Sequence, residues 1–160
     1  MRKAWIITGI IAILFLLMQA IRPEKNLGEM NAPEDLLQVS GVPDTLAVLF
    51  INSCYDCHSD HTRYPWYGSL APSSWLLASH IREGKSNLNF SSWGFLDKAQ
   101  KISLLERICD ECSEGLMPLK SYTLLHRSTI LEESETEAIC SWAEQESLDI
   151  LKARDQVKSD

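Results

Sequence analysis

Five consecutive residues carry the clearest chemical pattern in the chain: Cys54-Tyr55-Asp56-Cys57-His58. Two cysteines three positions apart can each form a thioether bond with one vinyl group of a single porphyrin. The residue that directly follows the second cysteine then lies close enough to bind the porphyrin iron through its imidazole. The C-x-x-C-H spacing therefore predicts one covalently attached haem c, bonded to Cys54 and Cys57, with His58 as an axial ligand of the iron.

A second axial ligand is expected from Met117, which stands between Leu116 and Pro118 well after His58 in the chain. A thioether is a soft ligand that favours reduced iron and so raises the reduction potential. Two histidines remain alternatives for this sixth position, and either would give bis-histidine iron with a lower potential. They are His80 and His126.

Aromatic residues follow the motif closely enough to line a haem pocket. A haem is a large, flat, apolar plate, and side chains that exclude water from it tune the iron. The same rings could equally form the ordinary core of a small domain, because Trp is largely buried in most proteins. We expect two or three of these five residues to contact the porphyrin: Trp66, Tyr67, Trp75, Phe90 and Trp93.

Three further cysteines leave open questions. Cys109 and Cys112 repeat the C-x-x-C spacing, but Ser113 follows where the haem motif has His, so a second attached haem is not expected. In an oxidising compartment Cys109 could form a disulfide with Cys112, although a pair three apart within a helix strains the ideal geometry, or Cys140 could pair with either of them. All three could instead be thiols that face the core. A Cys₄ zinc site built from the two C-x-x-C pairs is the alternative from another class of protein, although the pairs are far apart for a compact zinc module.

The N-terminus predicts a membrane segment. Residues 4–21 contain no charged side chain, and Arg2 and Lys3 precede them. A helix over this run would span roughly 27 Å, about the thickness of a bilayer core. Basic residues before such a helix favour a cytoplasmic N-terminus. We expect residues 1–21 to anchor the chain in the bacterial inner membrane as a single-pass transmembrane helix with the C-terminal domain in the periplasm; a cleaved signal peptide is the alternative.

The rest of the chain is expected to be all-α, because no segment shows the alternating pattern of a strand. Helical spacing of apolar residues predicts helices near 44–54, 72–82 and 97–114 and from 134 onwards, with Gly84 and Gly115 ending the second and third. The expected architecture is a small cytochrome-c-like helical domain behind one transmembrane helix. Its parts are a linker over 22–42, a c-type haem-binding domain over 43–147 and a polar C-terminal tail over 148–160.

Three stretches of the chain resemble the haem-binding-domain family of exported, often membrane-anchored proteins. They read CYDCHSDHTRYPWYGSLAPSSWL, HIREGKSNLNFSSW and GLMPLKSYTLLH, and the resemblance covers about residues 43–146. The resemblance implies iron ligation by His58 and, as the sixth ligand, Met117. Small cytochromes c usually carry Gly-Pro shortly after the haem histidine, and the proline carbonyl orients the imidazole. Here Tyr64-Pro65 occupies that region, so the sequence leaves open what orients His58.

The net charge of the chain limits the classes of partner that it can bind. The chain has 22 acidic against 15 basic residues and a net charge of −7. That balance argues against a nucleic-acid partner, whose phosphates require a basic face. We expect an electron carrier rather than an enzyme, with membrane lipid and an unidentified redox protein as partners. A haem enzyme, or a gas or redox sensor with an open iron position, is the alternative function.

Overall fold

The computed structural model describes the backbone of residues 1–157 and the side chains of residues 1–153, and within this part all regular elements are helices. This confirms the all-α class. The α-helices are α1 (Arg2–Met18), α2 (Leu36–Val39), α3 (Asp44–Ser53), α4 (Tyr55–His58), α5 (Ser73–Asn87), α6 (Lys98–Ser113), α7 (Lys120–Thr123) and α8 (Glu133–Val157), and the 3₁₀ helices are η1 (Trp66–Ser69), η2 (Phe90–Phe95) and η3 (Arg127–Thr129).

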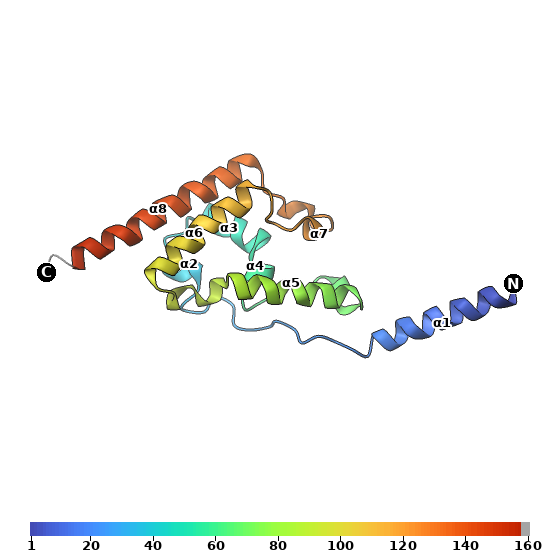
Figure 1. Ribbon diagram of the computed structural model, residues 1–160. Coiled ribbons are helices and arrows are strands. Elements are labelled where there is room, and N and C mark those ends of the chain that lie inside the picture. The colour runs from blue at the N-terminus through green and yellow to red at the C-terminus, as the bar shows by residue number, and fades with distance from the viewer. Residues whose placement is uncertain (158–160) are drawn as a thin grey trace.

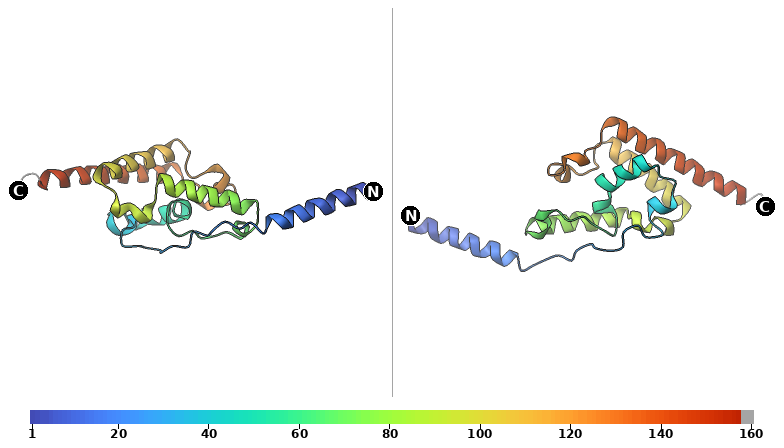
Figure 2. Two further views of the ribbon diagram at one scale, coloured as in Figure 1. Left: turned by 60° about the horizontal axis from the view of Figure 1, so that its bottom comes forward. Right: turned by 180° about the vertical axis from the view of Figure 1, so that it is seen from behind.

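The helices behind α1 form a head with two sides. Helices α6 and α8 lie side by side on one side, α5 runs along the other, and the short helices α3 and α4 lie between them (Figure 1). Helix α1 extends away from the head at one end, and the last turns of α8 project from the other (Figure 2). The first and last described residues therefore lie far apart.

The core lies where α2, α3 and η2 pack against α6 and α8. Phe50 of α3 contacts Phe90 and Trp142 edge-to-face, with ring centroids 5.6 and 5.4 Å apart. Such aromatic pairs add about 0.5–1.5 kcal/mol each beyond the burial of their area. The other buried members come from α2, α3, η2, α6 and α8: Leu36, Leu46, Trp93, Leu105, Ile108, Ile139 and Ala143.

The ends of the long helices follow local chemistry. The Asp97 carboxylate accepts a hydrogen bond from the Gln100 backbone N–H at 2.8 Å, and the Gln100 side chain accepts one from the Asp97 N–H at 2.9 Å. This capping box starts α6, and Gly115, with φ of +64°, follows its end as expected. Helix α8 continues to Val157, so the expected polar tail is helical as far as that residue. Residues 158–160 lie outside the described part.

Residues 22–42, expected to be a linker, pack against the head. The Asn26 side-chain amide donates to the Thr62 hydroxyl at 2.9 Å. Further along, Asp35 and Leu36 are buried, with 1% and 0% of their surface exposed. The packed part of the chain therefore begins before residue 43.

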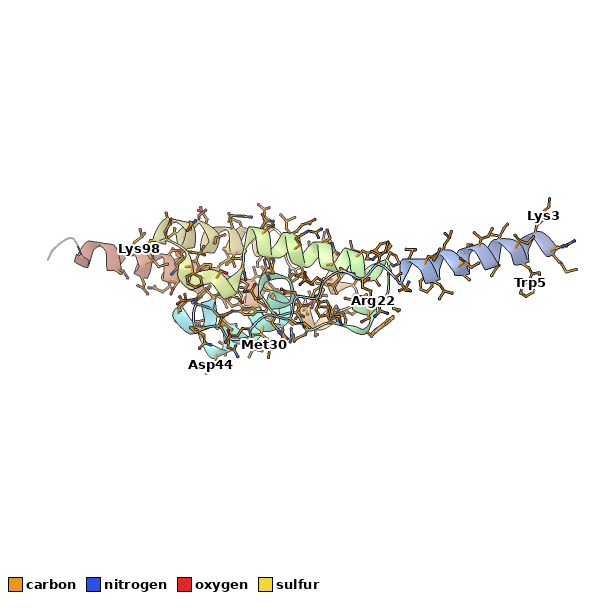
Figure 3. All side chains as sticks on the ribbon, turned by 90° about the horizontal axis from the view of Figure 1, so that it is seen from below. Lys3, Trp5, Arg22, Met30, Asp44 and Lys98 are labelled. Atoms are coloured by element: carbon orange, nitrogen blue, oxygen red, sulfur yellow. A yellow bond between two sulfur atoms is a disulfide. The ribbon has the colours of Figure 1, made fainter. Side chains whose placement is uncertain are left out.

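Helix α1 differs from the expected anchor in length. It has 17 residues and ends at Met18, before Ile21. Its side chains, such as those of Lys3 and Trp5, stand out from the helix away from the head (Figure 3), and none of its residues, all of them described, is buried. In the part of the chain that the structure describes, no helix combines the length and the apolar character needed to cross a membrane.

The residues that follow α1 bond to the start of α5. The Ala71 backbone N–H donates to the Gln19 side-chain oxygen at 2.9 Å. The Trp75 indole N–H donates to the Ile21 carbonyl at 2.8 Å. The end of α1 is therefore attached to the head through specific hydrogen bonds.

Helix α5 runs through Gly84, which the sequence analysis expected to end it. A Cβ atom at this position would lie 2.6 Å from the backbone oxygen of Cys57. Glycine is therefore needed here because α5 approaches α4 closely, and the expectation of a helix end was wrong because a glycine can serve either purpose.

Replacing Gly84 with alanine tests this close approach. We expect Gly84→Ala to lower the free energy of unfolding by about 1–3 kcal/mol, because the backbone of α4 or α5 must shift. Without a clash, the higher helix propensity of alanine would instead raise it by up to about 1 kcal/mol. Denaturant unfolding measures the difference. Gly41→Ala is the control, since a Cβ there meets no described atom within 4 Å.

A disulfide between Cys109 and Cys140 joins α6 to α8. It closes a loop with a sequence separation of 31 residues, and it is one of the three pairings that the sequence left open. Cys112 remains a free thiol.

We expect loss of this disulfide to destabilise the head. Cys109→Ala with Cys140→Ala should lower the free energy of unfolding by about 2–4 kcal/mol, because the unfolded chain gains entropy. Equilibrium unfolding with and without reductant provides the measurement, and the double variant should no longer respond to reductant. Cys112→Ala is the control and should respond as the unmodified chain does. The pairing would be refuted if peptide mapping found Cys140 bonded to Cys112.

Candidate functional site

A cavity of about 310 Å³ lies between α4, α5, α6 and the segment that follows α6. Its volume falls in the range of small-molecule sites. Most of the wall is apolar, with contributions from Leu88, Phe90, Leu104, Ile108 and Leu119.

The residues of the C-x-x-C-H motif meet the expected sixth ligand in this cavity. Cys54, Cys57 and His58 line it together with Met117, although Met117 lies far away in the sequence. His80 of α5 also lines the cavity, so it remains an alternative ligand. The other alternative, His126, is not among the lining residues.

The backbone carbonyl of Leu88 orients the His58 imidazole. His58 Nδ1 lies 3.0 Å from this oxygen. Because a carbonyl can only accept, Nδ1 must carry the proton, which leaves the lone pair of Nε2 free for a metal ion. Burial lowers the pKa of His58, against the opposing effect of the Leu88 and Gly84 carbonyls, and so favours the neutral ligand form. Leu88, the residue after α5, therefore orients the His58 imidazole, as the proline carbonyl of Gly-Pro does in small cytochromes c.

The cavity thiols are held in their neutral form. Burial is the main cause of the raised pKa of all three thiols. The pKa of Cys54 lies well above its ordinary value, and the pKa values of Cys57 and Cys112 each rise to about 11. A buried thiolate is disfavoured in such an apolar wall. A thioether carries no charge and has no such penalty.

Tyr55, the first residue between the two cysteines, fixes one side of α4. Its hydroxyl donates to the Asp35 carboxylate at 2.6 Å, and its ring stacks on Phe90 with centroids 5.0 Å apart. The Ser91 hydroxyl also donates to Asp35, at 3.3 Å. The buried Asp35 therefore connects residues 22–42 with the motif.

Asp56, the second of these residues, fixes the other side. Only 9% of its surface is exposed. Arg63 pairs with it, with Nε 3.0 Å from Oδ1, and the Tyr122 hydroxyl donates to Oδ2 at 2.7 Å. Sequence reasoning missed the roles of Asp56 and Tyr122, because no local pattern connects two residues so far apart in the chain.

Of the five aromatic residues expected in the pocket, Phe90 lines the cavity and the other four are placed elsewhere. Trp93 is fully buried in the core, and Trp66 is 80% exposed. The Tyr67 hydroxyl hydrogen-bonds to His126, and the Trp75 indole N–H donates to the backbone carbonyl of Ile21, after α1. Phe90 is therefore the member of this set that the structure places at the cavity, because nearness in sequence does not determine which face of a helix a ring occupies.

The disulfide also bears on the zinc alternative. Cys109 is bonded to Cys140, so it is not a free thiol beside Cys112. Among the described residues, no group of three or more metal-binding side chains is arranged to hold an ion. The four cysteines of the two C-x-x-C pairs therefore do not form a tetrahedral site in this fold.

Comparison with known proteins gives a family for the chain. Neither the curated proteins nor the solved structures include a match. A model of the family described as the haem-binding domain matches residues 13–145. This match extends from within α1 across the whole cavity to α8, and the chain belongs to the haem-binding domain family.

Proposed function

We propose that the protein is an electron carrier with one c-type haem, attached through Cys54 and Cys57 and ligated by His58 and Met117. The observation that carries this proposal is that all four side chains line one cavity. The His58 imidazole is already oriented there, with Nδ1 occupied by the Leu88 carbonyl.

The residues of the cavity fit such a group. Two neutral thiols suit the formation of uncharged thioether bonds, and the apolar wall suits a porphyrin face. Among the described residues that line the cavity, Arg107 alone is cationic, and we assign it to the carboxylate groups of the haem.

Bound haem supplies a one-electron couple. The chain contributes the two axial ligands, the orientation of His58 and an apolar wall that excludes water. A thioether from Met117 favours the reduced iron and raises the potential. Two ligands in one cavity favour a saturated iron, which suits electron transfer better than the open iron position of a haem enzyme or gas sensor.

We also propose that the head lies in the periplasm, attached to the bacterial inner membrane through α1. The Cys109–Cys140 disulfide supports an oxidising compartment. The exposed apolar side chains of α1, which follow Arg2 and Lys3, support membrane attachment. Attachment would raise the concentration of the head near membrane redox proteins.

Covalent attachment can be tested on a denaturing gel stained for haem. We expect Cys54→Ala with Cys57→Ala to abolish the stained band, because the chain then lacks both cysteines of the C-x-x-C-H motif. Cys112→Ala, which removes a third thiol from the same cavity, is the matched control and should keep the stain. A normal stained band from the double variant would contradict the proposal.

The axial role of Met117 can be tested by redox titration. We expect Met117→Ala to lower the reduction potential and to allow carbon monoxide to bind the reduced protein, because the iron loses its soft ligand. His80→Ala is measured beside it and should change neither property. An unchanged reduction potential in Met117→Ala, together with a changed potential in His80→Ala, would identify His80 as the sixth iron ligand instead.

A further inference from the structure

The segment that carries Met117 is weakly packed. None of the four residues of α7, all of them described, is buried. Around this helix Leu116, Leu124 and Leu125 are 52%, 72% and 63% exposed. A segment with so few buried apolar contacts opens at a low cost in free energy. Apolar packing alone therefore does not keep Met117 at the cavity.

A charge-assisted hydrogen bond connects this segment to the haem motif. The Tyr122 hydroxyl donates to Asp56 Oδ2 at 2.7 Å. The Arg63 side chain donates to both carboxylate oxygens, from Nε to Oδ1 at 3.0 Å and from Nη2 to Oδ2 at 3.2 Å. Arg63 therefore holds the acceptor in place, and hydrogen bonds to an ionised partner are stronger than neutral ones.

A second connection supports the same tyrosine. The His126 ring stacks on the Tyr122 ring, with centroids 4.4 Å apart and an interplanar angle of 17°. His126 Nε2 lies 2.8 Å from the Tyr67 hydroxyl, which belongs to η1. Tyr122 and His126 thus provide two side-chain connections from this segment, one to Asp56 of the haem motif and one to Tyr67 of η1.

We propose that Tyr122 is a positioning residue for the sixth iron ligand, acting through Asp56; this inference rests on the function proposed above. Asp56 and His58 belong to the same short helix, α4. The hydrogen bond of Tyr122 therefore connects the two chain segments that supply the two axial ligands. Without it the α7 segment leaves the cavity more often, and Met117 leaves with it.

The test uses the holoprotein and carbon monoxide as the probe. Tyr122→Phe removes one hydroxyl and keeps the ring that stacks on His126. We expect the apparent affinity of the reduced protein for carbon monoxide to rise about 10- to 100-fold, which corresponds to the loss of one hydrogen bond to a charged group. The reduction potential should fall in the direction seen for Met117→Ala.

Tyr64→Phe is the matched control. It also loses one hydrogen bond, the one that Asn26 N–H donates to the Tyr64 hydroxyl at 2.7 Å, but it does not touch the α7 segment. It should leave carbon monoxide binding unchanged. If Tyr122→Phe does not fold, Tyr67→Phe breaks the second connection and should raise the affinity in the same direction.

The outcomes separate the two proposals. Carbon monoxide binding that rises in Met117→Ala but not in Tyr122→Phe or Tyr67→Phe would overturn the role of Tyr122 and leave the axial pair intact. Equal changes in Tyr122→Phe and Tyr64→Phe would also overturn it, because the effect would then be general destabilisation. A protein without covalent haem, or a reduced Met117→Ala variant that does not bind carbon monoxide, would overturn the proposed function itself.

Discussion

Helix α4 has only four residues, Tyr55–His58, and a helix of this length is not stable on its own. Each of its residues contacts a different part of the chain. The Tyr55 hydroxyl hydrogen-bonds to Asp35, and the Asp56 carboxylate pairs with Arg63 and accepts a hydrogen bond from Tyr122. The Cys57 carbonyl lies against Gly84, and the His58 imidazole hydrogen-bonds to the Leu88 carbonyl. The conformation of the motif therefore depends on tertiary contacts, and so does the cavity that it lines.

Two buried carboxylates organise these contacts. An ionised carboxylate without partners costs several kcal/mol to bury. Asp35 accepts from the Tyr55 and Ser91 hydroxyls, and Asp56 accepts from the Arg63 guanidinium and the Tyr122 hydroxyl. Because these donors come from separate segments, burial of the carboxylates requires those segments to assemble in one arrangement. The segment that bonds to Asp56 is the one that brings Met117 to the cavity.

Helix periodicity predicted that α3, α5, α6 and α8 exist, because each of them buries one apolar face, but it ended α5 too early. It did not predict how residues 22–42 or the aromatic rings are used. Asp35 and Leu36 lie in a stretch too short to show a helical period, and their burial depends on Tyr55 and on the core rather than on any local pattern. Gly84 was misinterpreted for the same reason, since its neighbour Cys57 is distant in the chain.

The sequence by itself determined the local chemistry: two cysteines and a histidine at a spacing that suits one porphyrin, an all-helical chain, and a candidate methionine in a loop. These properties depend on residue types and on spacings of a few positions, which are the same however the rest of the chain packs. Tertiary structure alone decided that Met117 lines the same cavity as His58, that Leu88 orients the imidazole, and that Cys109 pairs with Cys140. Those contacts join residues that only the packing of separate helices brings together.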